Sequence, residues 1–170
     1  MVSTAFAQKG TGSFWGADSI EFVSDLKNRP YRITFRDNRG SKINSALGFS
    51  VCEVKYDAFG EFSEACFFDR VGELVCCEVE DWGLTNVARI HRKVSRKFDG
   101  IVEQWRFFND KDLPSANPKL NGAVMLEFHY DRFGDLVEGI SYDINLRTNV
   151  IKDVNQKFKR RNGFVPFALR

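Results

Sequence analysis

A four-residue pattern, Asp-x-x-Gly, constrains the fold of this chain more than any other feature. Aspartate at the first position of a type I turn accepts hydrogen bonds from the turn's own backbone. Glycine at the fourth position enters the left-handed region without a Cβ penalty. Each copy therefore predicts a tight β-hairpin turn closed by a bulge. The copies lie at residues 37–40, 57–60, 69–72 and 131–134, and degenerate copies lie at 98–100 and 110–113.

The turn pattern belongs to an internal repeat. Residues 48–69 and 122–143 are identical at eight of 22 positions, and Tyr56 and Tyr130 directly precede the turn aspartates. A middle copy places Phe98 and Gly100 where the first copy has Tyr56 and Gly60. Such two-strand units predict a mainly β fold, an antiparallel meander of successive β-hairpin repeats.

Composition narrows the class of protein. The chain has 170 residues with 25 Lys and Arg against 23 Asp and Glu, so 25 − 23 gives a net charge of +2. With 43% hydrophobic residues, this balance excludes a disordered tail, a collagen-like repeat and a membrane span. A nearly neutral chain does not favour a nucleic-acid partner. The four cysteines lack the C-x-x-C pairs of a zinc site, so we expect no metal and no cofactor.

The N-terminal region is expected to differ from the repeats. We predict a flexible leader over residues 1–17 and one domain of β-hairpin repeats over 18–170. A short N-terminal helix is expected to begin at Asp18 or Ser19, with Glu21 in its first turn, and to end before Pro30. The leader contains Ala5-Phe6-Ala7, the small-x-small pattern of a signal-peptidase site. Two localisations therefore stay open, periplasmic or secreted in one case and cytoplasmic in the other.

Side-chain pattern predicts the register of the hairpins. If residues 58–60 form the loop, the facing pairs are Tyr56 with Phe62, Val54 with Glu64 and Cys52 with Cys66. The later copy gives Tyr130 with Leu136, Phe128 with Glu138 and Leu126 with Ile140. The turn at 69–72 adds Phe68 with Leu74 and Cys66 with Cys76. A slip of one residue would move the apolar side chains to the opposite face.

Two segments are harder to assign. Residues 85–98 fit a helix through Val87, Ile90 and Val94, and they also fit a long strand. The repeat favours the strand. The stretch from Asn149 is expected to form a short amphipathic helix through Val154 and Phe158.

The tyrosine-aspartate turns, KYDAFG at 55–60 and HYDRFG at 129–134, resemble the YD repeats of bacterial rearrangement-hot-spot and teneurin-type shells. The alternation with a second turn, FFDRVG at 67–72, is similar to the short YD/FFD hairpin repeats of many bacterial proteins. The resemblance covers about residues 31–143. It implies a β-hairpin array that serves as a scaffold or binding surface, and it carries no catalytic residues. The shortened turn at 99–100 and the glycines missing after Asp110 and Asp143 depart from the pattern.

The chain offers few groups for chemistry. Cys52, Cys66 and Cys76 are predicted to lie side by side, either as core residues or as a disulfide or metal site, and Cys77 is predicted to point to the opposite face as the more reactive thiol. Glu64 and Glu138 are predicted on the apolar face, as structural ion pairs or as an acid and base. The two histidines, His91 and His129, are predicted on outward positions without a triad partner at a recognisable spacing.

Aromatic residues are the candidates for binding a partner. Phe59 and Phe133 occupy the third position of their turns and cannot reach the core of their own hairpins. They either pack between units or meet a partner, and we group them with Trp82 and Trp105 as candidate partner-binding residues. The basic runs at 89–97 and 157–161 are interpreted as solvated faces.

Together these patterns predict a non-enzymatic binding or scaffold module that presents a sheet face and turn aromatics to a protein or glycan. A small enzyme with a carboxylate site around Glu64 and Glu138 is one alternative. An inhibitor that neutralises a partner protein is the other. The oligomeric state stays open.

Overall fold

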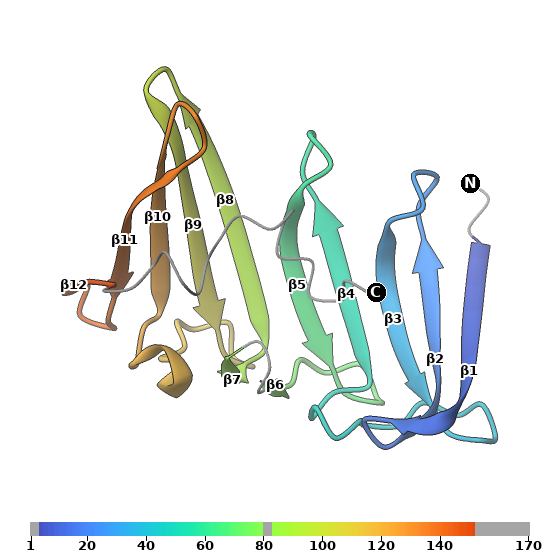
Figure 1. Cartoon of the computed structure of the whole chain (residues 1–170). Coiled ribbons are helices and arrows are strands. Elements are labelled where there is room, and N and C mark those ends of the chain that lie inside the picture. The colour runs from blue at the N-terminus through green and yellow to red at the C-terminus, as the bar shows by residue number, and fades with distance from the viewer. Residues whose placement is uncertain (1–3, 80–82, 152–170) are drawn as a thin grey trace.

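The computed structural model describes residues 4–79 and 83–151. Ten strands form one antiparallel sheet in the order β1-β2-β3-β4-β5-β8-β9-β10-β11-β12, and β6 and β7 form a separate pair (Figure 1). The strands are β1 (Thr4–Phe14), β2 (Ala17–Ser24), β3 (Pro30–Arg36), β4 (Val51–Tyr56), β5 (Phe62–Phe68), β6 (Cys77–Val79), β7 (Leu84–Val87), β8 (Arg89–Lys97), β9 (Gly100–Phe108), β10 (Met125–Asp131), β11 (Leu136–Tyr142) and β12 (Thr148–Val150). A short 3-10 helix, η2, spans Pro118–Leu120. The predicted mainly β, antiparallel meander is confirmed.

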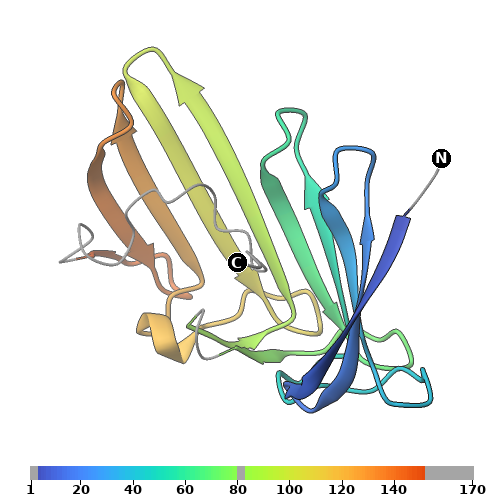
Figure 2. The same ribbon diagram turned by 45° about the vertical axis from the view of Figure 1, so that its right-hand side comes forward.

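The two ends of the strands differ, and each end forms one border of the sheet. The turns of the hairpins β2–β3, β4–β5, β8–β9 and β10–β11 all lie at one end of the strands, and the longer connections lie at the other end (Figure 2). We call these the tip edge and the connection edge. The strands of β2–β5 and those of β8–β11 are inclined to each other, so the sheet is strongly curved (Figure 2). The stretch 85–98 is extended rather than helical, as the repeat favoured, but it forms two strands, β7 and β8, that belong to different sheets and not one long strand.

The predicted N-terminal helix is not formed. Ala17–Ser24 form β2, which pairs with β1 on one side and with β3 on the other. Ile20 and Phe22 both pack into the core two residues apart, which is strand spacing. Glu21, expected in a first helical turn, instead accepts hydrogen bonds from Arg36 of β3 at 2.7 Å. Residues 4–14, expected as part of a leader, are the strand β1, and residues 152–170 of the expected C-terminal helix lie outside the described residues.

Seven turns share one hydrogen-bond pattern. In each, the carbonyl of the opening Asp or Asn accepts the N–H three residues on, and its own N–H donates to the carbonyl four residues on. The side-chain Oδ1 of the opening residue also accepts the N–H groups two and four residues on. The opening residues are Asp25, Asp37, Asp57, Asp69, Asn109, Asp131 and Asp143.

Three of these turns lack the glycine that the sequence pattern required. Asn28, Asp112 and Leu146 take the left-handed position with φ of 58°, 60° and 60°, whereas Gly60 has 84°. The side-chain acceptor of the opening residue is therefore the constant feature, and glycine is the common but replaceable one. The degenerate turn expected at 110–113 begins one residue earlier than predicted, because Asn109 opens it.

The turn at residues 98–99 has the shortest connection. Lys97 pairs directly with Gly100, so Phe98 and Asp99 form a two-residue loop. A Cβ on Gly100 would lie 2.0 Å from the carbonyl oxygen of Tyr130. Glycine is therefore required here because the backbone of β10 approaches so closely.

A bulge beside the tip turn changes the predicted register. Tyr56 pairs with Phe62 as expected, but Lys55 pairs with Glu64 and Cys52 with Phe67. The third hairpin repeats this, with Tyr130 opposite Leu136 and His129 opposite Glu138. The predicted outer pairs, Val54 with Glu64, Cys52 with Cys66, Phe128 with Glu138 and Leu126 with Ile140, are therefore wrong by one residue. The extra residue moves Glu64 to the face opposite the core.

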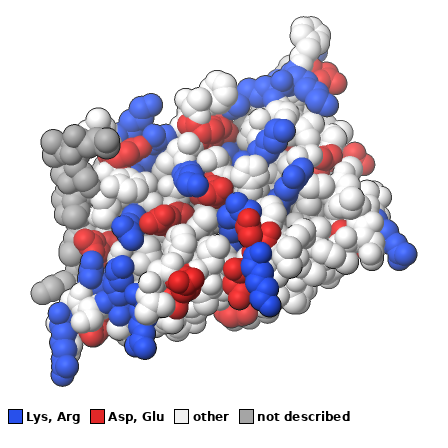
Figure 3. Space-filling view, turned by 180° about the vertical axis from the view of Figure 1, so that it is seen from behind, with Lys and Arg blue, Asp and Glu red and all other residues white. Residues whose placement is uncertain are grey.

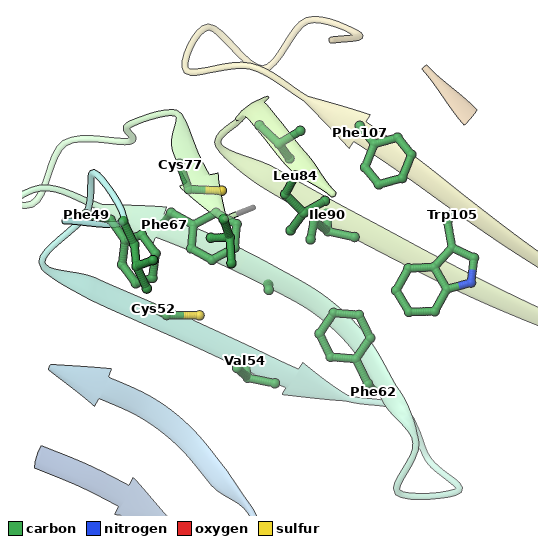
Figure 4. Packing of buried hydrophobic residues seen from close by; sticks show 14 of the residues in the cluster. Phe49, Cys52, Val54, Phe62, Phe67, Cys77, Leu84, Ile90, Trp105 and Phe107 are labelled. Carbon is green, nitrogen blue, oxygen red and sulfur yellow. The ribbon is translucent and has the colours of Figure 1, made fainter. Parts of the chain in front are cut away.

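One hydrophobic cluster holds the curved sheet together. Phe35, Phe67 and Phe107 each lie two residues before a connection-edge turn, and all three are buried. Trp15, Phe35, Phe49 and Phe67 form a chain of ring contacts with centroids 6.1, 5.5 and 4.8 Å apart. Figure 4 shows the cluster continuing to Ile90, Trp105 and Phe107 on β8 and β9.

Replacement of Asp57 tests the turn. Asp57→Ala removes the acceptor of two backbone N–H groups, and we expect the free energy of unfolding to fall by about 1–2 kcal/mol in urea denaturation. Asp57→Asn is the matched control, since Asn109 makes the same bonds in its own turn, and it should stay close to the parent. An asparagine variant as unstable as the alanine variant would show that acceptor geometry is not what this side chain contributes.

Acid should weaken the turn at Asp69. The N–H of Glu73 is the largest cause that lowers the pKa of this carboxyl below its ordinary 3.8; partial desolvation opposes it, and the N–H groups of Val71 and Gly72 add to the lowering. A carboxyl with a lowered folded-state pKa stabilises the fold above its unfolded pKa and loses that contribution as pH falls through the folded value.

We therefore expect the free energy of unfolding to decrease below about pH 4. The decrease should be smaller in Asp69→Asn, whose amide keeps the acceptor and cannot titrate in this range. Equal pH slopes for the two proteins, measured by chemical denaturation, would contradict this assignment.

Candidate interaction surface

Each of the four tip turns displays one large apolar side chain. Leu26, Phe59, Phe98 and Phe133 expose 83%, 76%, 104% and 75% of their surface. They lie on the successive hairpins β2–β3, β4–β5, β8–β9 and β10–β11, at the edge marked by the hairpin bends in Figure 1. Three of the four are phenylalanines, so the tip edge is an aromatic row.

Arginine side chains lie against two of these rings. The guanidinium of Arg96 is 4.6 Å from the ring centroid of Phe59, and that of Arg132 is 4.7 Å from Phe133. Arg96 comes from β8, so this contact joins two neighbouring hairpins. A cation over a ring face is favourable and leaves the other face open to solvent.

The four predicted partner-binding residues do not lie on one surface. Phe59 and Phe133 lie at the tip edge as expected. Trp105 is buried instead: it stacks on Phe62 with centroids 5.6 Å apart, and its Nε1 donates to Glu103 at 2.6 Å. Trp82 lies outside the described residues. Leu26 and Phe98 were missed, although the position of Phe98 next to Asp99-Gly100 could have indicated a tip.

A buried polar cluster lies where β5 and β8 separate. These strands pair only from Glu64 to Cys66, and Figure 1 shows them diverging toward the tips. Arg92 fills the gap: its guanidinium donates to Glu103 at 2.8 Å, to the Phe62 carbonyl at 3.0 Å and to Glu61 at 3.2 Å. Burial acts to lower the pKa of Arg92, but bonds to Glu103 and Glu61 raise it overall, so the side chain stays charged.

The two glutamates proposed as an acid and base are far apart. Glu64 lies on β5 and Glu138 on β11, four strands apart, which is about 19 Å at normal strand spacing. Glu64 binds Lys55 at 2.6 Å and faces Arg89 at 3.9 Å. Partial burial opposes ionisation of Glu64, and Lys55 outweighs it, so the pKa is lowered. The two carboxylates do not share a site.

The cysteines do not form the predicted row. Cys52 and Cys77 are buried with their thiols directed into the core, as Figure 4 shows, whereas Cys66 lies on the outer face beside Glu64. Cys77, predicted to point away from the core, is instead fully buried, and this burial raises the pKa of its thiol to about 12. Burial, followed by the charge of Glu64, raises the pKa of Cys66 to about 12. All four cysteines are free.

The outer face of the sheet carries one further polar cluster. Glu127 accepts hydrogen bonds from Gln104 at 2.6 Å and Tyr142 at 3.5 Å, and its other contact is His129 at 2.7 Å. Partial burial opposes ionisation of Glu127, but the bonds from Gln104 and His129 lower its pKa overall. Its carboxylate is satisfied by its neighbours, which is typical of a structural role.

Charge on the side of the molecule behind the sheet is mixed. Figure 3 shows Lys and Arg intermixed with Asp and Glu over most of this side. Some are paired across strands, such as Arg32 with Glu53 at 3.6 Å and Lys55 with Glu64 at 2.6 Å, and Arg89 of β8 pairs with Asp112 of the turn after β9. A mixed surface of this kind does not attract one charged partner over the whole sheet.

Comparison of the chain with family models, curated proteins and solved structures finds no match. Among residues 4–79 and 83–151, no group of three or more His, Cys, Asp or Glu residues is placed to hold a metal ion. In the same part of the chain, no helix has the length and apolar character needed to cross a bilayer. Connection-edge turns also expose apolar side chains, such as Val71 and Leu146, but these are aliphatic, whereas three of the four exposed side chains at the tip edge are phenylalanines.

Loss of Arg92 tests the buried cluster. Arg92→Met leaves the Glu103 carboxylate and the Phe62 carbonyl without this donor, and we expect a loss of about 3–5 kcal/mol in the free energy of unfolding. The double variant Arg92→Met, Glu103→Gln removes the uncompensated charge and should recover part of that loss in the same urea titration. A double variant less stable than the single one would contradict this account.

Proposed function

We propose that the protein is a non-enzymatic binding module that contacts its partner through the tip edge. The observation that carries this proposal is the row formed by Leu26, Phe59, Phe98 and Phe133, one exposed apolar side chain on each of four successive hairpins. Exposed aromatic side chains are enriched where proteins meet other molecules.

The turn itself does not require an aromatic residue. The turn opened by Asp37 makes the same backbone and Oδ1 hydrogen bonds as the one opened by Asp57, with Asn38 and Arg39 in place of Ala58 and Phe59. Both arrangements close the turn, so the exposed ring adds nothing to its geometry. Its presence is better explained by contact with another molecule.

The enzyme alternative has less support. Its two carboxylates lie on separate strands, and Glu64 is engaged by Lys55 and Arg89. The inhibitor alternative requires one charge-rich exposed face, and the ion pairs across the outer face leave charges of both signs there. The binding-module proposal relies on the four apolar tip side chains, which are exposed in the folded chain.

Photo-crosslinking tests the proposal without assuming the class of partner. A benzophenone analogue of phenylalanine placed at Phe98 reacts with nearby C–H bonds of proteins, glycans or lipids. In cells that make the protein, we expect adducts from position 98 and from position 133. Position 71 is the matched control, since Val71 is 74% exposed at the third position of a connection-edge turn. Adducts that are absent, or equal at positions 71 and 98, would overturn the proposal.

A further inference from the structure

We infer that Asp99-Gly100, at the bend between β8 and β9, is a site of backbone modification, where aspartate converts through a cyclic succinimide into isoaspartate. The inference does not depend on the proposed function. It depends on the residue that follows Asp99, on the state of the Asp99 carboxylate and on the geometry of the two-residue loop.

The reaction joins a side-chain carboxyl to the next backbone nitrogen. The nitrogen of Gly100 attacks Cγ of Asp99, so a C–N bond forms, the Cγ–O bond breaks, and the carboxyl hydroxyl leaves with the amide proton as water. Water then opens the ring at either carbonyl and gives aspartate or isoaspartate, with no atom gained or lost overall. A Cβ on the following residue hinders the attack, and glycine has none. Asp99 is the only aspartate in the chain that precedes a glycine.

The carboxylate of Asp99 is not held by its turn. In the turns opened by aspartate elsewhere, as at Asp57, the side chain accepts backbone N–H groups. Asp99 instead lies within a two-residue loop, between Lys97 and its pairing partner Gly100, and it is exposed. Its carboxylate makes no hydrogen bond or ion pair within residues 4–79 and 83–151. The carboxyl can therefore rotate toward the nitrogen of Gly100.

The modification changes the shortest loop of the tip edge. Isoaspartate carries the main chain through Cβ and Cγ, which adds one backbone atom between Asp99 and Gly100. Gly100 is fixed, because it pairs with both β8 and β10, and an added Cβ would lie 2.0 Å from the carbonyl oxygen of Tyr130. The extra atom is therefore accommodated on the other side of the loop, where it displaces the exposed Phe98.

Ageing of the purified chain tests the inference. The chain is kept at physiological temperature and neutral pH for several weeks, and peptide mapping separates the aspartate and isoaspartate forms at each position. We expect isoaspartate at position 99 to reach at least about five times the amount at Asp57 or Asp131, which are followed by residues with a Cβ. Asn121 and Asn162 also precede glycine, but they form the ring with loss of ammonia, so their products gain mass and are counted separately.

A conservative variant is the matched control. Asp99→Glu keeps the charge and lengthens the side chain by one carbon, which removes the favourable five-membered ring. Isoaspartyl methyltransferase with labelled S-adenosylmethionine methylates the isoaspartyl carboxyl. We expect this label in the peptide that contains position 99 of the aged parent chain, and none in the same peptide of the variant.

Hydrogen exchange tests the effect on the loop. The amides at the tip of β8–β9 should exchange faster in the separated isoaspartate form than in the unmodified chain, and those at the tip of β4–β5 should not change. Isoaspartate at position 99 that does not exceed the amounts at Asp57 and Asp131, or label that persists in Asp99→Glu, overturns the site. Equal exchange in the two forms overturns the effect on the loop.

Discussion

The fold depends on one interaction, the acceptance of two backbone N–H groups by the side chain that opens each turn. Asp57 Oδ1 accepts the N–H groups of Phe59 and Glu61 at 2.9 Å, and the other six turns repeat this pair of bonds. Because the carboxamide of Asn109 makes the same bonds, the acceptor matters more than the charge. Once these turns alternate between the two edges, the strand order follows, since each strand can only return beside the one before it.

The sequence was informative where structure is local. The four glycine-containing turns, the innermost pairs of the β4–β5 and β10–β11 hairpins and the extended conformation of most of 85–98 all follow from residues close in the chain. The turn at Asp25 was missed because Asp18 and Glu21 imitate a helix start, and only pairing with β1 and β3 decides between the two. The bulge at Ser63 was missed because its sequence carries no glycine, and one extra residue then shifted every outer pair. This is why Glu64 and Cys66 were assigned to the wrong face.

The Arg92 cluster could not be predicted for a different reason. It depends on the divergence of β5 from β8, which are separated in sequence by the β6–β7 pair. Where the ladder ends, the carbonyl of Phe62 loses its strand partner, and a guanidinium with several donors replaces the missing N–H. Glu103 and Glu61 compensate the buried charge. The basic run at 89–97, interpreted from sequence as a solvated face, thus contains one arginine that is buried.

The phenylalanines show how one residue type takes two roles in the same repeat. Phe35, Phe67 and Phe107 lie two residues before connection-edge turns and fill the core, whereas Phe59, Phe98 and Phe133 lie within tip turns and face solvent. Backbone bonds and an aspartate acceptor already close the turns at Phe59 and Phe133, so closing the turn does not require these rings, each of which contacts one arginine. The tip edge can therefore change its side chains without changing the sheet beneath it, which separates the binding surface from the interactions that hold the fold.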